Sequence, residues 1–276
     1  MVLCMPVLAI AQSTTSSANT RTTTETTSEA QITRIDTSVV LVAGVPVVVD
    51  NPYGDVRLRF GGYEHGIDAH AVVQQPPGAS VIAMQPAMVD GQYRIAPRLP
   101  EGSRLADGQR LDLVIFVAEG HPVIARTEQG LIESRGIRAD ISLNSISGDM
   151  AIRGTQGSIQ ARTGSGSIEA SLGPAPAGST QTLATGTGTI ILAVDDTLDA
   201  HLEMSTSAAF ATEFSLQVER IPGQEPNKKA IAVIGEDQAT IIVESRRGEI
   251  RLLRWSEFTS TDGKPVDDRK VESDSD

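Results

Sequence analysis

Four histidines supply all the imidazole groups available for metal binding or acid–base chemistry, and they are His65, His70, His121 and His201. The segment from Glu64 to His70 contains two of them together with two carboxylates, and both groups are ordinary zinc ligands. The spacing is not the helical two-histidine spacing of a zinc enzyme, and Gly66 between the histidines favours a loop or a strand. We therefore expect surface histidines, with no metal site.

Calcium would be the natural ion of a glycine-rich β-repeat, because such repeats place an aspartate in every unit as an oxygen ligand. Here the equivalent position holds Asp149 once and then Ser158 and Ser167. A ladder of calcium ions would lack its carboxylates, so the sequence predicts no bound calcium.

The constellations that would indicate catalysis are incomplete. Gly164-Ser165-Gly166 and Gly186-Thr187-Gly188 give only the first half of a dinucleotide fingerprint, without a third glycine that opens a helix. The single cysteine, Cys4, lies in the apolar start. Adjacent carboxylates at Asp195-Asp196 and Asp267-Asp268 would point to opposite faces of a strand, so we interpret them as solvated charge. We predict no catalytic residue and no cofactor, and hence no enzyme.

Short strands must carry all of these residues, because glycines divide the chain into β-branched runs. In Val56-Arg57-Leu58-Arg59-Phe60 the apolar residues alternate with arginines, which indicates a half-buried strand. Aromatic residues make up only 3% of the chain, so the core must consist of small aliphatic side chains.

A repeat is the main organising feature of the sequence. The segments Gly148–Arg153, Gly157–Arg162 and Gly166–Ser171 stand nine residues apart, with echoes at Gly188–Leu192 and Gly248–Leu252. In each segment glycine and a polar residue supply a corner, the third and fifth positions point inward, and the fourth and sixth face water. Two such arms make a coil of roughly eighteen residues. We predict an all-β fold, namely a stacked β-repeat or β-solenoid (β-helix-like) with short strands and Gly-rich corners.

The composition divides the chain into four parts. Residues 1–11 form an apolar run that ends in Ala9-Ile10-Ala11, which we interpret as a truncated signal peptide without its basic start. Residues 12–30 are a Ser/Thr-rich linker, too polar to order. Residues 31–258 are the β-repeat domain, with an N-terminal part at 31–127 and a Gly-x-Ile part at 128–258. Residues 259–276 are predicted to be an acidic, disordered tail.

The net charge of −12 removes the main driving force for binding nucleic acid, so no nucleic-acid partner is expected. After the apolar start, no stretch reaches the ~18 consecutive apolar residues of a membrane helix. We predict no transmembrane segment in the mature chain.

The order of several motifs resembles the bacterial "putative adhesin" domain family. They are Asp50-Asn51-Pro52-Tyr53-Gly54-Asp55-Val56, Leu111–Val117, Ser147–Met150, Gly164–Ile168 and Gly186–Ile190. The resemblance covers about Ile32 to Trp255, and the chain departs from the family at Val117-Ala118, where the family has Val-Pro. It implies an exported β-strand-repeat protein, similar to auto-transporter adhesin heads, without catalytic residues.

Together these features predict an exported, non-catalytic module that contacts an unknown macromolecular or cell-envelope partner through an extended face. The expected location is the periplasm, the cell surface or the medium. Two alternatives remain open: a β-helical polysaccharide lyase or hydrolase, and a structural envelope-stress protein without a tight ligand.

Overall fold

The structure is a computed structural model that describes residues 18–26, 30–62, 66–195, 197–236 and 238–255. The predicted signal peptide at 1–11 and the predicted tail at 259–276 lie outside these ranges. Within them the regular elements are strands, and no helix is long and apolar enough to cross a membrane. The all-β prediction is therefore confirmed.

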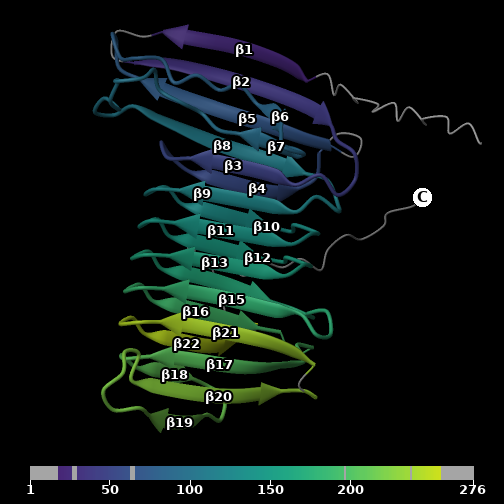
Figure 1. The fold of residues 1–276 in the computed structure, drawn as a ribbon, viewed down its shortest axis with the longest axis vertical. Coiled ribbons are helices and arrows are strands. Elements are labelled where there is room, and N and C mark those ends of the chain that lie inside the picture. The colour runs from purple at the N-terminus through teal and green to yellow at the C-terminus, as the bar shows by residue number, and fades with distance from the viewer. Residues whose placement is uncertain (1–17, 27–29, 63–65, 196, 237, 256–276) are drawn as a thin grey trace, which may run out of the picture.

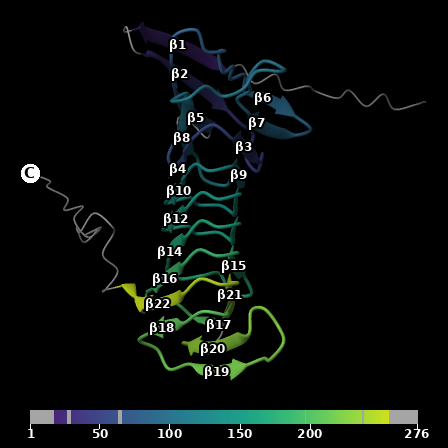
Figure 2. The same ribbon diagram turned by 90° about the vertical axis from the view of Figure 1, so that its left-hand side faces the viewer.

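In the described part of the chain, twenty-two strands form two sheets of eleven strands each, and the sheets face one another along the stack (Figures 1 and 2). Sheet A has the order β1 (Asn19–Thr26), β2 (Gln31–Val40), β5 (Gly66–Gln75), β8 (Arg110–Val117), β4 (Val56–Phe60), β10 (Ile132–Arg135), β12 (Met150–Arg153), β14 (Ile168–Leu172), β16 (Ile190–Val194), β22 (Ile250–Arg254) and β18 (Phe210–Thr212). Sheet B has the order β19 (Gln217–Arg220), β20 (Lys228–Ile234), β17 (Ala200–Thr206), β21 (Ala239–Ser245), β15 (Thr180–Thr185), β13 (Ile159–Thr163), β11 (Ile141–Ser145), β9 (Val123–Thr127), β3 (Val47–Asn51), β7 (Gln92–Ile95) and β6 (Ala87–Val89).

In the middle of the molecule the chain alternates between the sheets, and we call each sheet-B strand with the sheet-A strand that follows it a coil. Successive coils pair in parallel, and Ile132, Met150 and Ile168 lie directly beside one another in sheet A. These residues are 18 positions apart, which agrees with two nine-residue arms per coil. The next partner of Ile168 is Ile190, because the longer loop between β14 and β15 adds residues between those two coils.

Both ends of the stack depart from this pattern. At the N-terminal end the long strands β1, β2, β5 and β8 pair antiparallel. Residues 19–26 belong to the segment expected to be a linker, yet they form β1, whose eight residues are all exposed. Eight backbone positions of β1 lie opposite β2, and hydroxyl pairs such as Thr20 with Thr37 add to the pairing.

At the C-terminal end, strand order in space differs from order along the chain. The last coil, β21–β22, lies between the β15–β16 coil and the earlier strands β17 and β18. Strand β17 pairs in parallel with β21 and antiparallel with β20, and β18 pairs with β22. Strands β19 and β20 extend sheet B beyond β17 at this end.

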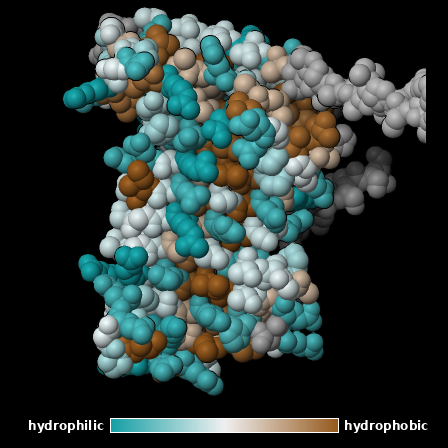
Figure 3. Space-filling view, in the orientation of Figure 1, coloured by the Kyte–Doolittle hydropathy of each residue, from teal (hydrophilic) through white to brown (hydrophobic). Residues whose placement is uncertain are grey.

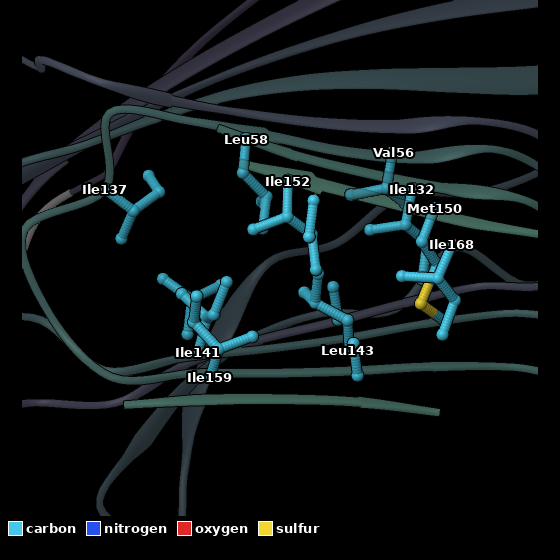
Figure 4. Close-up of a cluster of buried hydrophobic side chains, with 14 of the residues drawn as sticks. Val56, Leu58, Ile132, Ile137, Ile141, Leu143, Met150, Ile152, Ile159 and Ile168 are labelled. Carbon is cyan, nitrogen blue, oxygen red and sulfur yellow. The ribbon is translucent and has the colours of Figure 1, made fainter. Parts of the chain in front are cut away.

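The core lies between the two sheets and follows from alternation along each strand. Ile159 is 1% exposed and Ile168 is fully buried, whereas Gln160 faces solvent and Glu169 is half-buried. Figure 4 shows the aliphatic side chains of successive coils stacked against one another. Fully burying one such side chain stabilises the fold by roughly 1.5–3 kcal/mol, so the stack replaces the aromatic core that the composition does not provide.

At five corners where a coil passes from sheet B to sheet A, a hydroxyl residue stands three residues before a glycine. The Thr185 hydroxyl accepts a hydrogen bond from the Gly188 amide at 3.2 Å and donates one to the Gly166 carbonyl, one coil earlier, at 2.8 Å. Thr163 and Ser245 make the equivalent bonds.

The corner glycines form a column in which each coil touches the one before it. A Cβ atom on any of them would overlap the carbonyl oxygen of the glycine one coil earlier, and the overlapping positions are Gly130, Gly148, Gly166, Gly188 and Gly248. Glycine is therefore required here for close approach.

Candidate functional site

The described histidines lie far apart in the fold and form no common site. His70, on β5, contacts Asp36 on β2 at 2.7 Å on the outer face of sheet A. His121 is buried, and its Nδ1 lies 2.9 Å from the Val45 carbonyl oxygen. His201, on β17, lies 3.8 Å from Glu203. His65 lies outside the described residues.

Corner aspartates hold the backbone of neighbouring coils. Asp149 Oδ1 accepts a hydrogen bond from the Ser167 amide at 2.7 Å, and Asp140 Oδ1 accepts one from the Ser158 amide at 2.8 Å. The positions compared with calcium-binding repeats thus serve coil-to-coil contacts. Over the ranges that the structure describes, no group of three or more histidine, cysteine or acidic side chains is arranged to hold a metal ion.

The remaining candidate motifs also have local structural roles. The Asp195 carboxylate accepts hydrogen bonds from the amide and hydroxyl of Thr197, and so closes its own turn. Asp196 and the pair Asp267-Asp268 lie outside the described residues. The two Gly-x-Gly segments belong to the glycine column.

The outer face of sheet A carries a network of ion pairs. Arg59 lies 2.8 Å from Glu133, and Arg153 lies 3.4 Å from Glu169. Farther along, the hydrogen bond to Asp112 raises the pKa of Arg110 above its ordinary value. A depression of about 430 Å³ opens beside Glu133 and Glu169. Because these charges already have partners on their own sheet, this face offers little unsatisfied charge to a ligand.

The outer face of sheet B contains a different kind of depression at its C-terminal end, with a volume of about 500 Å³. We call it the sheet-B groove, and it is lined by Glu203, Met204, Ser205, Gln217, Val218, Glu219, Lys229, Ala230, Ile231, Ile242 and Glu244. Four strands, β17, β19, β20 and β21, supply these residues. Figure 3 shows apolar surface over the lower strands of this face, set among hydrophilic side chains.

Strand register places the groove residues in two rows across the face. In one row Glu203 lies between Ile231 and Ile242, directly opposite each of them. In the second row Ser205 lies between Lys229 and Glu244. Successive side chains of a strand point to opposite faces of the sheet. The residues between the groove residues along each strand are buried in the core, so the groove residues themselves point outward.

The groove combines apolar contact area with an excess of negative charge. Ile231 is 43% exposed and Ile242 is 36% exposed, so both offer area that another molecule can cover. The lining contains three carboxylates, Glu203, Glu219 and Glu244, against one amine, Lys229. Such a surface can attract a cation and bury the apolar groups beside it.

The sequence alone did not single out these groove residues. Period-two alternation within 200–206 and 239–245 identifies strands with an outward row, and that signal was available. It does not reveal that the two strands are neighbours, because 32 residues separate the end of β17 from the start of β21.

No protein-family model matches the chain, and no curated protein sequence matches it. Two solved structures match most of the chain in a structural comparison. One, a "putative cell adhesion protein" from Clostridium sporogenes, has 11% identity and a TM-score of 0.45, and the match covers 87% of this chain and 100% of that one. The other, a "putative adhesin" from Bacteroides fragilis, has 9% identity and a TM-score of 0.37, and the match covers 86% and 97% of the two chains.

Proposed function

We propose that this chain is an exported, non-catalytic β-solenoid that binds a macromolecular partner of the cell envelope or cell surface, in the manner of an adhesin. The apolar start with its Ala9-Ile10-Ala11 ending and the resemblance of the repeats to an adhesin domain family support export and surface binding. Export predicts a mature chain that begins near Gln12 in protein from the native host, which mass spectrometry measures. A chain that retains residues 1–11 would contradict it.

The sheet-B groove is the observation that carries the binding role. Its floor belongs to four strands of a rigid stack, so the side chains are positioned before a partner arrives and little ordering entropy is lost on binding. The carboxylate of Glu203 between Ile231 and Ile242 fits a partner that presents a cation flanked by apolar groups. An extended polypeptide segment has this chemistry when a basic residue carries apolar residues two positions before and two positions after it, because every second side chain then faces the groove.

A labelled peptide with the repeating order Leu-Ser-Lys-Ser-Leu tests this binding chemistry, because its leucine and lysine side chains share one face when the peptide is extended. Fluorescence anisotropy at low ionic strength should show saturable binding to the purified protein, and a peptide with glutamate in place of lysine should not bind. Glu203→Lys reverses the charge at the centre of the groove and should weaken binding by about tenfold or more.

Glu236→Lys is the matched control, because Glu236 is exposed and outside the groove lining, and the substitution changes the net charge equally. It should bind the lysine–leucine peptide nearly as well as the unaltered protein. Equal weakening by the two substitutions would mean that overall charge attracts the peptide, and the groove assignment would then fail.

A further inference from the structure

Strand β1 is the terminal strand of sheet A, and Figures 1 and 2 both place it at one end of the stack. Its backbone pairs with β2 on one side, and no described strand pairs with the other side. A strand edge of this kind presents unpaired N–H and C=O groups in a row, ready to pair with another strand.

Apart from one arginine and one glutamate, the sequence of β1 lacks the usual protection against such pairing. Natural edge strands are short, contain proline or lysine, or are twisted away by a bulge. Strand β1 has eight residues, Asn-Thr-Arg-Thr-Thr-Thr-Glu-Thr, with no proline and no lysine. Its register with β2 is continuous from Asn19 to Thr26, without a bulge. The one arginine and the one glutamate cancel in charge, so strands of this sequence do not repel one another.

We propose that β1 is a self-association surface, at which β1 pairs antiparallel with β1 of a second copy of this chain. Antiparallel pairing about a two-fold axis puts residues of the same face opposite one another. With the axis at Thr23, Arg21 of each copy lies opposite Glu25 of the other. Each two-fold contact then contains two salt bridges related by symmetry.

The side chains around the seam support this register. Arg21 lies opposite Asp36 on β2, and Glu25 lies 3.5 Å from Arg34, so each charge at the seam already has an opposite charge behind it. Across the joined edge the charges would therefore alternate in sign. Asp36 on β2 is followed by Arg21 on β1 of the same copy, and then by Glu25 on β1 of the second copy. The intervening threonines would pair with threonines, as Thr24 already does with Thr33 at 3.2 Å.

The stack geometry leaves room for this contact. A rotation about an axis perpendicular to sheet A directs the second stack away from the first and keeps both sheets B on the same side. The result is two stacks joined end to end, with sheet A continuous across the seam. An edge contact of eight residues is small, so we expect a dimer with a dissociation constant in the micromolar range or weaker.

Charge reversal gives a test in which two non-associating variants should associate with each other. Arg21→Glu places two pairs of glutamates across the seam, and Glu25→Arg places two pairs of arginines there. Sedimentation equilibrium over micromolar to submillimolar concentrations should show each variant dimerising at least about tenfold more weakly than the unaltered protein. An equal mixture of the two should recover dimers, because both seam pairs are then Glu–Arg.

Arg220→Glu and Glu236→Arg are the controls, since both residues are exposed and both charge changes match those of the test variants. Arg220 lies on β19, at the opposite end of the stack. Both controls should dimerise like the unaltered protein and keep its melting temperature. The two seam variants also place like charges between β1 and β2, so each should melt slightly lower, and recovery of dimers in their mixture separates this effect from the seam contact. The proposal is overturned if the unaltered protein stays monomeric, if either reversal leaves the dimer intact, or if the mixture does not recover it.

Discussion

At the corners after β13, β15 and β21, the hydroxyl and the glycine form one unit that repeats from coil to coil. The Thr163 hydroxyl accepts from Gly166 and donates to Gly148, so each unit links two coils and satisfies buried backbone groups that water cannot reach. The Gly-x-Ile pattern predicts the glycines as corners but assigns no role to the hydroxyl three residues before them. That spacing, Ser or Thr followed three residues later by Gly, is visible in the sequence at five corners: Thr127, Ser145, Thr163, Thr185 and Ser245.

Gly166→Ala should destabilise the protein, because the added methyl overlaps the Gly148 carbonyl oxygen of the previous coil. We expect a loss of about 3 kcal/mol or more in the free energy of unfolding, since backbone on both sides must move. Gly173→Ala is the control, because no atom lies within 4 Å of the position that its added methyl would take, and its φ angle is not positive. It should change stability by no more than about 0.5 kcal/mol. Urea denaturation of the two variants measures the difference, and equal stabilities would contradict the close stacking.

Tyr93, on β7, gives the fold a sensitivity to alkaline pH. It is 2% exposed, its hydroxyl has no hydrogen-bond partner, and burial raises its pKa from 10.0 to about 12. Because the folded pKa lies above the unfolded one, its contribution to stability is complete below pH 10 and is lost as the pH rises to 12. A pKa difference of one unit between the folded and unfolded states corresponds to ~1.4 kcal/mol. The free energy of unfolding therefore falls by at most about 3 kcal/mol over this pH range.

Tyr93→Phe should remove this pH dependence. Below pH 10 the variant should be as stable as the unaltered protein or more stable, since the buried hydroxyl lacks a partner. Between pH 10 and 12 it should lose less stability. Denaturation curves of both proteins at pH 8, 10 and 11.5 measure the difference, and parallel losses in the two proteins would refute this role for Tyr93.

At the scale of the strand, the alternation of buried and exposed residues is the feature that the sequence predicts best. Ile159 lies beside Ile141 in register and is buried, whereas Gln160 next to it is exposed. The two-arm coil also followed from the spacing of the Gly-x-Ile segments. Strand β1 was not predicted, because a run of threonines shows no apolar alternation and forms a strand here through its pairing with β2.

Ile159→Asp should cost several kcal/mol, because it buries a carboxylate without a partner in an aliphatic layer. Gln160→Lys, one residue further on, should change stability by no more than about 0.5 kcal/mol. Chemical denaturation of both variants checks the contrast. Similar losses at the two positions would be inconsistent with the strand assignment.

At the scale of the molecule, the core is extended because two sheets face one another along the whole stack. Their strands pair in parallel in the middle, and antiparallel strands are added at both ends. This arrangement explains how a chain with 3% aromatic residues forms a large core. The repeat predicts the middle of this stack. It does not predict the groove, because that site depends on β17, β20 and β21 becoming neighbours in an order that differs from the chain. Neighbour order at such an end results from long-range pairing, which local spacing does not encode.

The whole stack should be stable without metal ions, because the corner carboxylates of Asp140 and Asp149 hold backbone amides. The melting temperature should be the same with a chelator as with added calcium or zinc. Differential scanning calorimetry measures it. A change of 1 kcal/mol in the free energy of unfolding shifts the melting temperature by ~2–4 °C. A shift of several degrees on adding the ion or the chelator would therefore show that a bound ion contributes to the fold.

The position of the coil β21–β22 in the two sheets determines when folding of the molecule can finish. A chain leaving the ribosome with its N-terminus first can add the coils from β9–β10 to β15–β16 in the order in which they emerge, each on a finished neighbour. Strands β17 and β18 come next along the chain, but the strands that connect them to the stack, β21 and β22, are the last described strands to be made. The C-terminal end therefore closes only after Arg254 has been synthesised, and a nascent chain stalled before that point displays the unpaired edges of β15 and β16.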